Sequence, residues 1–258
     1  MINDIVGRCE NLLVKIKQGD AAARRQMAEI FPKLQDLADS GRADAQALVG
    51  GLALEYIDDT DAALRYFRMA ATVDNPAGQR GLGHMLANGI GTRKNIPEAA
   101  DLFEAAARSG DAIAAFNLGS LLLKGTGIAP DEGKAVEFLK EALAGGVPEA
   151  AALLADWHAN RSEHGEARKL YIDAANAGST KAMLTLGKWF ASGIGGAVDK
   201  VEAVRWFLRP IDVGDGDGVH EAIQVARTMA DAEIREAAVR AGRPDDAEAL
   251  INAARNPA

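Results

Sequence analysis

Residues 114–119 read Ala-Ala-Phe-Asn-Leu-Gly, and the Leu-Gly pair that closes this stretch recurs along the chain. Leu82-Gly83 lies 36 residues before it, and Leu186-Gly187 ends the same pattern further on. Val49-Gly50 and Leu154-Ala155 keep the register, so five markers follow one another at intervals of 32–36 residues. Intervals of this length are typical of repeat proteins built from two-helix units.

Each marker belongs to a longer pattern that repeats in step with it. A second apolar pattern follows in every unit, as in Glu98-Ala99-Ala100-Asp101-Leu102-Phe103 and Glu202-Ala203-Val204-Arg205-Trp206-Phe207. Small residues stand five positions before the five markers: Ala45, Gly78, Ala114, Ala150 and Ala182. Each unit therefore predicts two helices that touch closely, and stacking on the neighbouring units would bury their apolar faces.

Polar residues and glycines mark where these helices begin and end. Asn75, Asp111 and Ser179 are expected to cap the first helices, and Pro76 and Pro148 directly follow cap positions. Asn95 and Asp199 precede glutamate by three residues, as in a capping box. The second helices are expected to close on left-handed residues, which are Gly110, Gly146, Gly178 and Gly214, with Asp74-Asn75 in the first unit.

The composition favours helices over strands. Alanine accounts for 52 of the 258 residues, whereas aromatic residues make up only 5%, and alanine is the best helix former. Apolar residues make up 48% and charged residues 26%, which is typical of a globular protein. The formal net charge of −8 argues against bulk attraction to nucleic acid or to an anionic membrane. The single cysteine, Cys9, excludes an internal disulfide and any multi-cysteine metal site.

The chain resembles the Sel-one-like repeat family, which is related to the tetratricopeptide repeat but has a longer, glycine-containing loop between its helices. The resemblance rests on Ala114-Ala115-Phe116-Asn117-Leu118-Gly119, on the loop Asn88-Gly89-Ile90-Gly91 and its counterpart Ser192-Gly193-Ile194-Gly195, and on the helix end Ala105-Ala106-Ala107-Arg108-Ser109-Gly110. It implies an all-α, right-handed α-α superhelix of about five repeats. The first and fourth units depart from the pattern, because Asp58-Asp59-Thr60-Asp61 and Arg161-Ser162-Glu163-His164-Gly165 predict tight turns instead of the loop.

The repeats imply a division of the chain into an array with a helical cap at each end. The repeats are placed at 44–75, 76–111, 112–147, 148–179 and 180–216, between an N-terminal cap at 1–43 and a C-terminal cap at 217–258. In the first cap we expect helices from Ile2 to Lys17 and from Ala21 to Asp39, with Pro32 starting or kinking a helix. In the last we expect helices from Val219 to Ala241 and from Asp245 to Ala254. Pro210 is expected to end or kink the preceding helix early.

No motif in the sequence points to catalysis or to a cofactor. The loops at Gly89, Gly125 and Gly193 lack the strand and the further residues of a phosphate-binding motif, so we interpret them as turns between helices. Cys9 lies on an apolar helical pattern and is expected in the core. Asp212 to Gly218 is an acidic linker or, alternatively, a weak cation site without both end ligands of a calcium loop. The histidines lack zinc-ligand spacing: His84, His158, His164 and His220.

The surface left for function is the concave one, which the first helices line in tetratricopeptide-like stacks. By that resemblance its exposed columns lie three positions before, and one and five positions after, each marker. They predict a partner-binding stripe suited to an extended or helical peptide, the alternative being that these residues only face solvent. The stripe consists of Arg80, His84 and Asn88, of Phe116, Ser120 and Lys124, of Asp156 and Asn160, and of Leu184, Lys188 and Ser192, with Ala152 in the same columns.

These features predict a non-enzymatic scaffold or adaptor that binds a protein or peptide partner. An inhibitor or immunity-type protein that blocks an enzyme or toxin is an alternative within the same class. A hydrolase-like enzyme is disfavoured for lack of a catalytic motif, and a homo-oligomer assembled through the end caps remains open, with a monomer favoured. No cofactor, metal, nucleic acid or membrane partner is expected, and the absence of a signal peptide or a run of about 20 apolar residues predicts a cytoplasmic protein.

Overall fold

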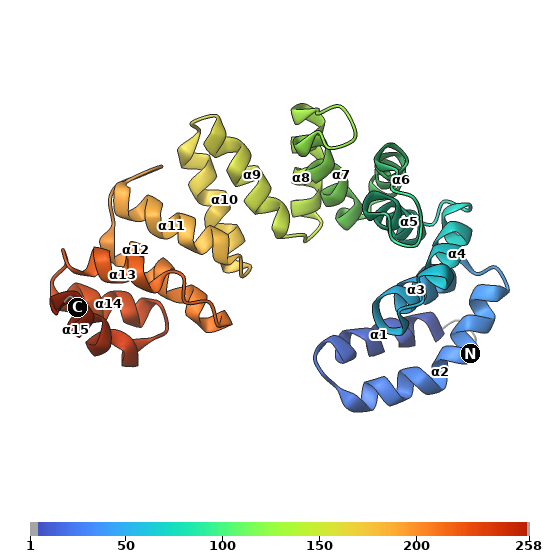
Figure 1. Cartoon of the computed structure of the whole chain (residues 1–258), viewed down its shortest axis with the longest axis horizontal. Coiled ribbons are helices and arrows are strands. Elements are labelled where there is room, and N and C mark those ends of the chain that lie inside the picture. The colour runs from blue at the N-terminus through green and yellow to red at the C-terminus, as the bar shows by residue number, and fades with distance from the viewer. Residues whose placement is uncertain (1–4, 257–258) are drawn as a thin grey trace. The chain divides into compact units, whose positions relative to one another are not determined.

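The computed structural model describes residues 5–256, and within them the chain is helical, with no strand (Figure 1). The chain divides into two compact units, 1–147 and 148–258. The predicted all-α repeat fold is confirmed in both. Consecutive helices pack against each other as antiparallel hairpins joined by short turns or loops.

Residues 5–147, the described part of the first unit, contain eight α-helices and one short π-helix, η2. Their bounds are α1 Ile5–Lys17, α2 Ala21–Asp39, α3 Ala43–Leu52, η2 Ala53–Ile57, α4 Thr60–Ala71, α5 Pro76–Asn88, α6 Ile96–Arg108, α7 Ala112–Lys124 and α8 Glu132–Ala144. The pairs α3 and α4, α5 and α6, and α7 and α8 are the hairpins of three successive repeats. Helix α3 also contacts α5, so first helices of neighbouring repeats lie side by side.

The second unit contains seven α-helices and two short 3-10 helices, η3 and η4. Their bounds are α9 Glu149–Asn160, α10 His164–Asn176, α11 Thr180–Ser192, α12 Lys200–Leu208, η3 Arg209–Val213, α13 Val219–Ala226, α14 Asp231–Arg240, η4 Pro244–Asp246 and α15 Ala247–Arg255. Helix α12 ends two residues before Pro210, as expected. It packs against α13 and α14, which together with α15 enclose the core of the C-terminal cap.

The glycine of each Leu-Gly marker makes room for a large side chain of the second helix. A Cβ atom on Gly119 would lie 2.8 Å from Cγ of Leu139, a separation that real contacts essentially never show. Because Leu139 is fully buried, it cannot swing away. The same close approach joins other marker glycines to aromatic rings, namely Gly50 to Phe67, Gly83 to Phe103 and Gly187 to Phe207. The marker therefore encodes the contact between the two helices of a repeat.

The small residues five positions before the markers serve contacts between successive repeats. Ala45, Ala114 and Ala150 are fully buried. At Gly78 in α5, a Cβ would lie 2.4 Å from Cβ of Ala70 in α4, the last helix of the preceding repeat. The marker glycine thus sets the distance to the second helix of the same repeat, and the small residue five positions before it sets the distance to the second helix of the preceding repeat. Small residues recur at both positions for this reason.

The predicted caps form, although the capping boxes are only half made. Asn95 and Asp199 accept the backbone N–H groups of Glu98 and Glu202. In a full capping box the glutamate side chain would bind the backbone N–H of the cap residue. Here those N–H groups donate to carbonyl oxygens of the preceding helix, at Leu86 and Phe190, 2.9 Å away in both loops. A backbone hydrogen bond to the preceding helix thus replaces the glutamate contact of the capping box.

Three expectations at the helix ends are corrected by the structure. Pro32 starts no helix but lies inside α2, which runs from Ala21 to Asp39 as expected. Pro148 stands at the N-cap position of α9 rather than one residue after it, a one-residue difference at a helix end. The long helix expected from Val219 to Ala241 is broken between α13 and α14.

The break between α13 and α14 has a cause far along the chain. The guanidinium of Arg255 in α15 donates to the carbonyl oxygens of Ala226 and Met229, at 3.3 and 2.7 Å. Glu233 accepts the backbone N–H of Ala230 at 2.8 Å and so begins α14. The backbone groups freed by the break therefore find partners, and the side chain of Met229 is buried. The expected start at Ile2 lies outside the described residues.

Candidate partner-binding groove

A groove of about 960 Å³ runs across the first helices of the first unit. Helices α1, α3, α5 and α7 line it together with η2, Phe67 of α4, Ile90 of the loop after α5 and the turn between α6 and α7. It lies entirely within one unit and is open to solvent. The repeat architecture creates it, because the second helices of each hairpin pack behind the first ones.

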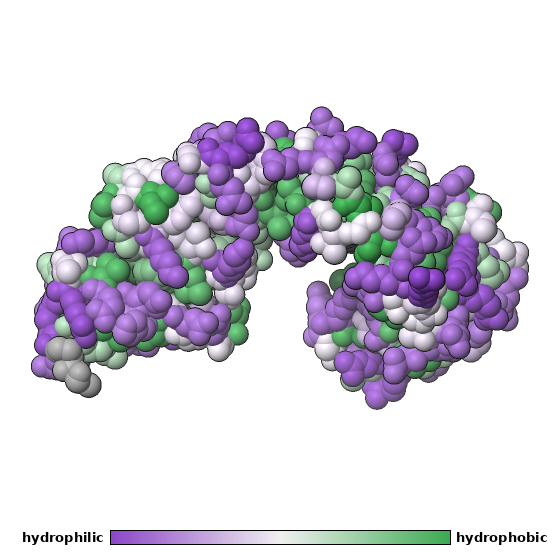
Figure 2. Space-filling view, turned by 45° about the horizontal axis from the view of Figure 1, so that its top comes forward, coloured by the Kyte–Doolittle hydropathy of each residue, from purple (hydrophilic) through white to green (hydrophobic). Residues whose placement is uncertain are grey.

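The floor of the groove is apolar. Leu48, Leu54 and Phe67 line it, and two large side chains stand out from it: Tyr56 is 46% exposed and Ile113 is 48% exposed. Large apolar groups in a concave surface rimmed by polar residues mark interaction sites. On the visible face in Figure 2, apolar surface of the first unit lies between hydrophilic patches.

The rim of the groove carries more acidic than basic side chains. Four carboxylates line it, at Glu10, Asp44, Glu55 and Asp111, whereas its cations are Lys17 and Arg80, with His84 between the helices. The cations already have partners within the groove. Lys17 lies 3.9 Å from Glu55, and Arg80 lies 3.5 Å from Asp111. The same two contacts occupy Glu55 and Asp111, so Glu10 and Asp44 are the carboxylates of the lining that these cations do not pair.

Asp44 is held in its charged form at this rim. Partial burial opposes its ionisation, but hydrogen bonds from the Arg42 guanidinium and from the backbone N–H of Ala45 outweigh burial, so the pKa of Asp44 lies below its ordinary value. The Arg42 contacts are bidentate, at 2.9 Å to each carboxylate oxygen from Nε and Nη2. The geometry is that of a strong ion pair.

Of the predicted stripe, two residues of α5 lie in the groove. Arg80 and His84 line it, while Asn88 stands at the end of the helix and donates to the carbonyl oxygen of His84 at 2.8 Å. The structure does not place Phe116, Ser120 and Lys124 of α7 among the lining residues. In α7 the groove is lined by Ile113 and Asn117 instead.

The difference is a rotation of the interacting face. In α3, α5 and α7, lining residues lie at two positions relative to the marker, six residues before it and two residues before it. The position two residues before the marker is occupied by Leu48, Gly81 and Asn117. In α3 and α5 the lining residues also include the columns three before and one after it. The predicted columns therefore share two of these four. Glu55 of η2 lies five positions after Gly50, in the third predicted column, whereas the lining residues of α1, Glu10 and Leu13 among them, carry no repeat signal that would have placed them here.

Of the five predicted residues in the second unit, Asp156 and Leu184 take part in internal contacts and the other three are exposed. Asp156 accepts a hydrogen bond from the Tyr171 hydroxyl at 2.5 Å and one from Lys181 Nζ at 2.8 Å. Burial, together with this carboxylate, raises the pKa of Tyr171. Leu184 packs against the core of the C-terminal cap. Asn160, Lys188 and Ser192 are exposed, and the Ser192 hydroxyl donates to the Lys188 carbonyl.

No side-chain cluster typical of a metal centre is found among residues 5–256. Within that range no group of three or more histidine, cysteine, aspartate or glutamate side chains converges. Cys9 is fully buried, and burial raises the pKa of its thiol, which makes it a poor nucleophile. Asp212 of the acidic segment pairs with Arg243 at 2.8 Å. The part of the chain that is described also contains no helix with the length and hydropathy needed to cross a membrane.

Comparison with known families identifies the repeat. The model of the Sel1 repeat matches residues 43–75, 76–111, 112–147 and 180–209, which is more than half of the chain. The chain belongs to the Sel1 repeat family. The stretch 148–179, where Ala155 replaces the marker glycine and a tight turn replaces the loop, is not among the matched Sel1 repeats.

Solved structures with the same fold agree with this assignment. A Sel1 repeat protein from Oxalobacter formigenes is 26% identical, with a TM-score of 0.65 over 74% of this chain and 58% of that one. A protective antigen of uropathogenic Escherichia coli, which displays an SLR fold, is 19% identical, with a TM-score of 0.72 over 94% of this chain and 58% of that one. The chain thus spans a little over half the length of these two proteins. The comparison with curated proteins gave no match.

Proposed function

We propose that this Sel1 repeat protein is a non-enzymatic scaffold that binds a protein or peptide partner in the groove of its first unit. Sel1 repeats generally mediate protein–protein interaction. The observation that carries the proposal is the pair of large apolar side chains, Tyr56 and Ile113, about half exposed in a groove whose other apolar residues are packed. Aromatic and large aliphatic anchors of this kind supply most of the binding energy in protein interfaces.

The acidic rim defines the kind of partner segment that fits. An apolar side chain of the partner would lie against Tyr56 and Ile113, and basic residues beside it would face Glu10 and the carboxylates of the rim. Opposite charge raises the association rate and rejects acidic competitors. Lys17 and Arg80 are paired with Glu55 and Asp111, and Asp44 is paired with Arg42, so Glu10 is the carboxylate of the groove that a basic residue of the partner would meet without breaking an ion pair.

The groove is open, which favours a macromolecular partner over a small substrate. An enzyme of this size would enclose its substrate in a cavity with converging titratable groups. The groove instead presents ion pairs around an apolar floor. An inhibitor or immunity-type protein would use the same surface. It would be distinguished from a scaffold because the captured partner loses its activity when bound.

The test is affinity purification from the native host with three matched baits, followed by calorimetry on the purified partner. Ile113→Glu and Tyr56→Glu place a charge in the apolar floor, and Val73→Glu places the same charge at a residue 61% exposed outside the groove. We expect the groove variants to bind the partner at least about tenfold more weakly, since hot-spot losses exceed about 1.4 kcal/mol. Equal affinity for the groove variants and Val73→Glu would exclude the groove as the binding site.

A further inference from the structure

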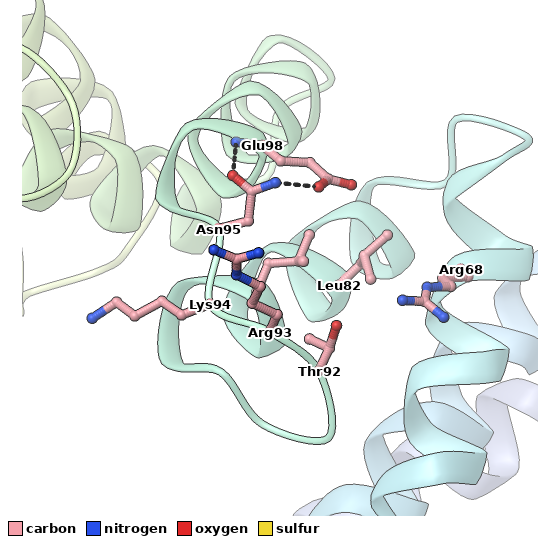
Figure 3. Close-up of a pocket in the computed structure, with 8 residues that line it drawn as sticks. Arg68, Leu82, Thr92, Arg93, Lys94, Asn95 and Glu98 are labelled. Atoms are coloured by element: carbon pink, nitrogen blue, oxygen red, sulfur yellow. Dashed lines mark hydrogen bonds between the residues drawn. The ribbon is translucent and has the colours of Figure 1, made fainter.

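A second cavity of the first unit, of about 460 Å³, lies beside the loop that joins α5 to α6. Arg68 of α4, Leu82 and Leu86 of α5, the loop residues Thr92 to Asn95, and Glu98 of α6 line it. In Figure 3, Arg68 extends toward Leu82 and Thr92 from the neighbouring helix, and Arg93 lies near Asn95. Two successive repeats thus contribute cations to one cavity.

These cations have no partner among the described residues. No carboxylate lies within ion-pair distance of Arg68, Arg93 or Lys94 anywhere between residues 5 and 256. Glu98 is the one carboxylate of the lining, and its Oε2 accepts a hydrogen bond from Asn95 Nδ2 at 2.7 Å. In a chain whose formal net charge is −8, this is a local excess of positive charge.

The two sister loops of the chain show that the turn does not need these charges. The loops 89–95, 125–131 and 193–199 have equal length, and each begins with two glycines of positive φ, at 72 and 61°, 60 and 80°, and 75 and 73°. In each, the N–H of the cap residue donates to the preceding helix, with N···O distances of 2.9, 3.2 and 2.9 Å. The backbone is therefore the same in all three.

Only the first of these loops is basic. Where it has Arg93-Lys94, the others have Ala129-Pro130 and Ala197-Val198. Where it has Asn95 as the helix cap, both others have aspartate, at Asp131 and Asp199. Relative to its sisters this loop gains two positive charges and loses one negative charge. All three substitutions make this loop more positive, and none is required to close it.

We infer that this cavity binds an anion of the phosphate type. Arg68 of one repeat and Arg93 of the next line this cavity together with Thr92, and guanidinium and hydroxyl groups are donors that suit an anion with several oxygens. Asn95 and Glu98 lie at the N-terminal end of α6, a helix of 13 residues whose dipole favours negative charge there. The volume allows a phosphate group together with the molecule that carries it.

The test is a titration of the full chain at constant ionic strength, followed by the amide NMR signals of residues 92–98. The probes are pyrophosphate, for a small-molecule source, and a phosphoserine peptide with its unphosphorylated form, for a protein source. We expect saturable chemical-shift changes with pyrophosphate and the phosphoserine peptide and none with the unphosphorylated peptide. Whichever of the two binds more tightly identifies the natural anion as a small molecule or as part of a protein. Absence of saturable shifts with both probes would overturn the inference.

The variants come from the sister loops, so the fold is expected to tolerate them. Arg93→Ala with Lys94→Val reproduces the sequence Ala197-Val198 and should weaken binding at least about tenfold, because it removes both cations that the loop contributes. Asn95→Asp restores the aspartate cap, keeps the helix capped, and should weaken binding less. Arg24→Ala with Arg25→Val removes the same charge from exposed positions of α2 and should leave binding unchanged. If the loop variant and the α2 variant lost the same affinity, net charge alone would explain the binding, and the proposed site would be contradicted.

Discussion

The repeat 112–147 and the stretch 148–179 solve the same packing problem in different ways. In the first, Gly119 leaves a space that Leu139 fills without a polar contact. In the second, Ala155 stands at the marker, and the residue in the register of Leu139 is Tyr171, whose hydroxyl reaches Asp156. Its ring also meets Trp189 edge to face, at 5.2 Å between centroids. A glycine marker is therefore one means of joining the two helices, and a hydrogen-bonded tyrosine is another.

This comparison explains why the family model matches one stretch and not the other. The matched repeats all have the marker glycine, and repeat 43–75 is matched although it lacks the long loop, so the glycine is the feature that the stretch 148–179 alone lacks. Helices α9 and α10 pack as closely as other hairpins despite lacking both features. Sequence similarity to the family and membership of the repeat array are thus separate properties in this chain.

The largest effect is expected from removing the apolar side chain of the glycine-type contact. Leu139→Ala deletes a fully buried side chain and leaves a cavity, so the free energy of unfolding of the first unit should fall by about 2–5 kcal/mol. Chemical denaturation measures it. A loss below that of an exposed-site variant such as Lys140→Ala would contradict the account of the contact.

A somewhat smaller effect is expected from filling the space opposite Leu139. Gly119→Val places atoms where Leu139 already lies, and overpacking of this kind costs about 1–3 kcal/mol. The matched control is Gly165→Ala in α10, where a Cβ meets nothing within 4 Å. That change should instead stabilise the helix by about 0.5–1 kcal/mol, because alanine restricts the unfolded chain. Equal signs for the two substitutions would show that helix propensity, and not the space at the marker, governs these glycines.

A smaller effect again is expected in the tyrosine-type contact. Tyr171→Phe removes one hydrogen bond but leaves Asp156 with Lys181, so the second unit should lose about 0.5–1.5 kcal/mol. Asp156→Asn, which weakens the bond to Lys181 and keeps an acceptor for Tyr171, provides the control. If Tyr171→Phe left the stability unchanged, ring packing alone would account for the contact.

The smallest effect concerns pH at the groove. The pKa of Asp44 is lowered in the folded chain, so its ion pair stabilises the fold fully above the ordinary pKa of aspartate, about 3.9, and that stabilisation is lost as the pH falls through the lowered folded value. Asp44→Asn should therefore make stability less dependent on pH between about 5 and 2. Denaturation curves at a series of pH values measure this, and parallel curves for the two proteins would contradict it.

The hairpins were predictable from the sequence because their determinants lie close together in it. The Leu-Gly marker, the glycines of the loops and the caps are local signals, and the structure confirms the helices that they predict. The break between α13 and α14 was not predictable, because Arg255, more than twenty residues away, supplies partners for its carbonyl groups. No glycine or proline marks the break in the sequence.

The groove could be predicted in kind but only partly in position. The register predicted that first helices line a binding surface, and Arg80 and His84 of the predicted stripe line the groove, while their role in binding stays a prediction. The rotation of each helix about its axis depends on how deeply residues such as Phe67 sit between the helices, which a column of sequence does not show. Helix α1 and η2 bring Leu13 and Tyr56 into the groove without any repeat pattern.

The groove as a binding surface is tested most directly by crosslinking in the native host. A photoreactive residue at Ile113, half exposed in the groove, is compared with one at Val73, exposed outside it. We predict a discrete crosslinked protein from position 113 and none from position 73. The same product from both positions, or a product from position 73 alone, would contradict the account.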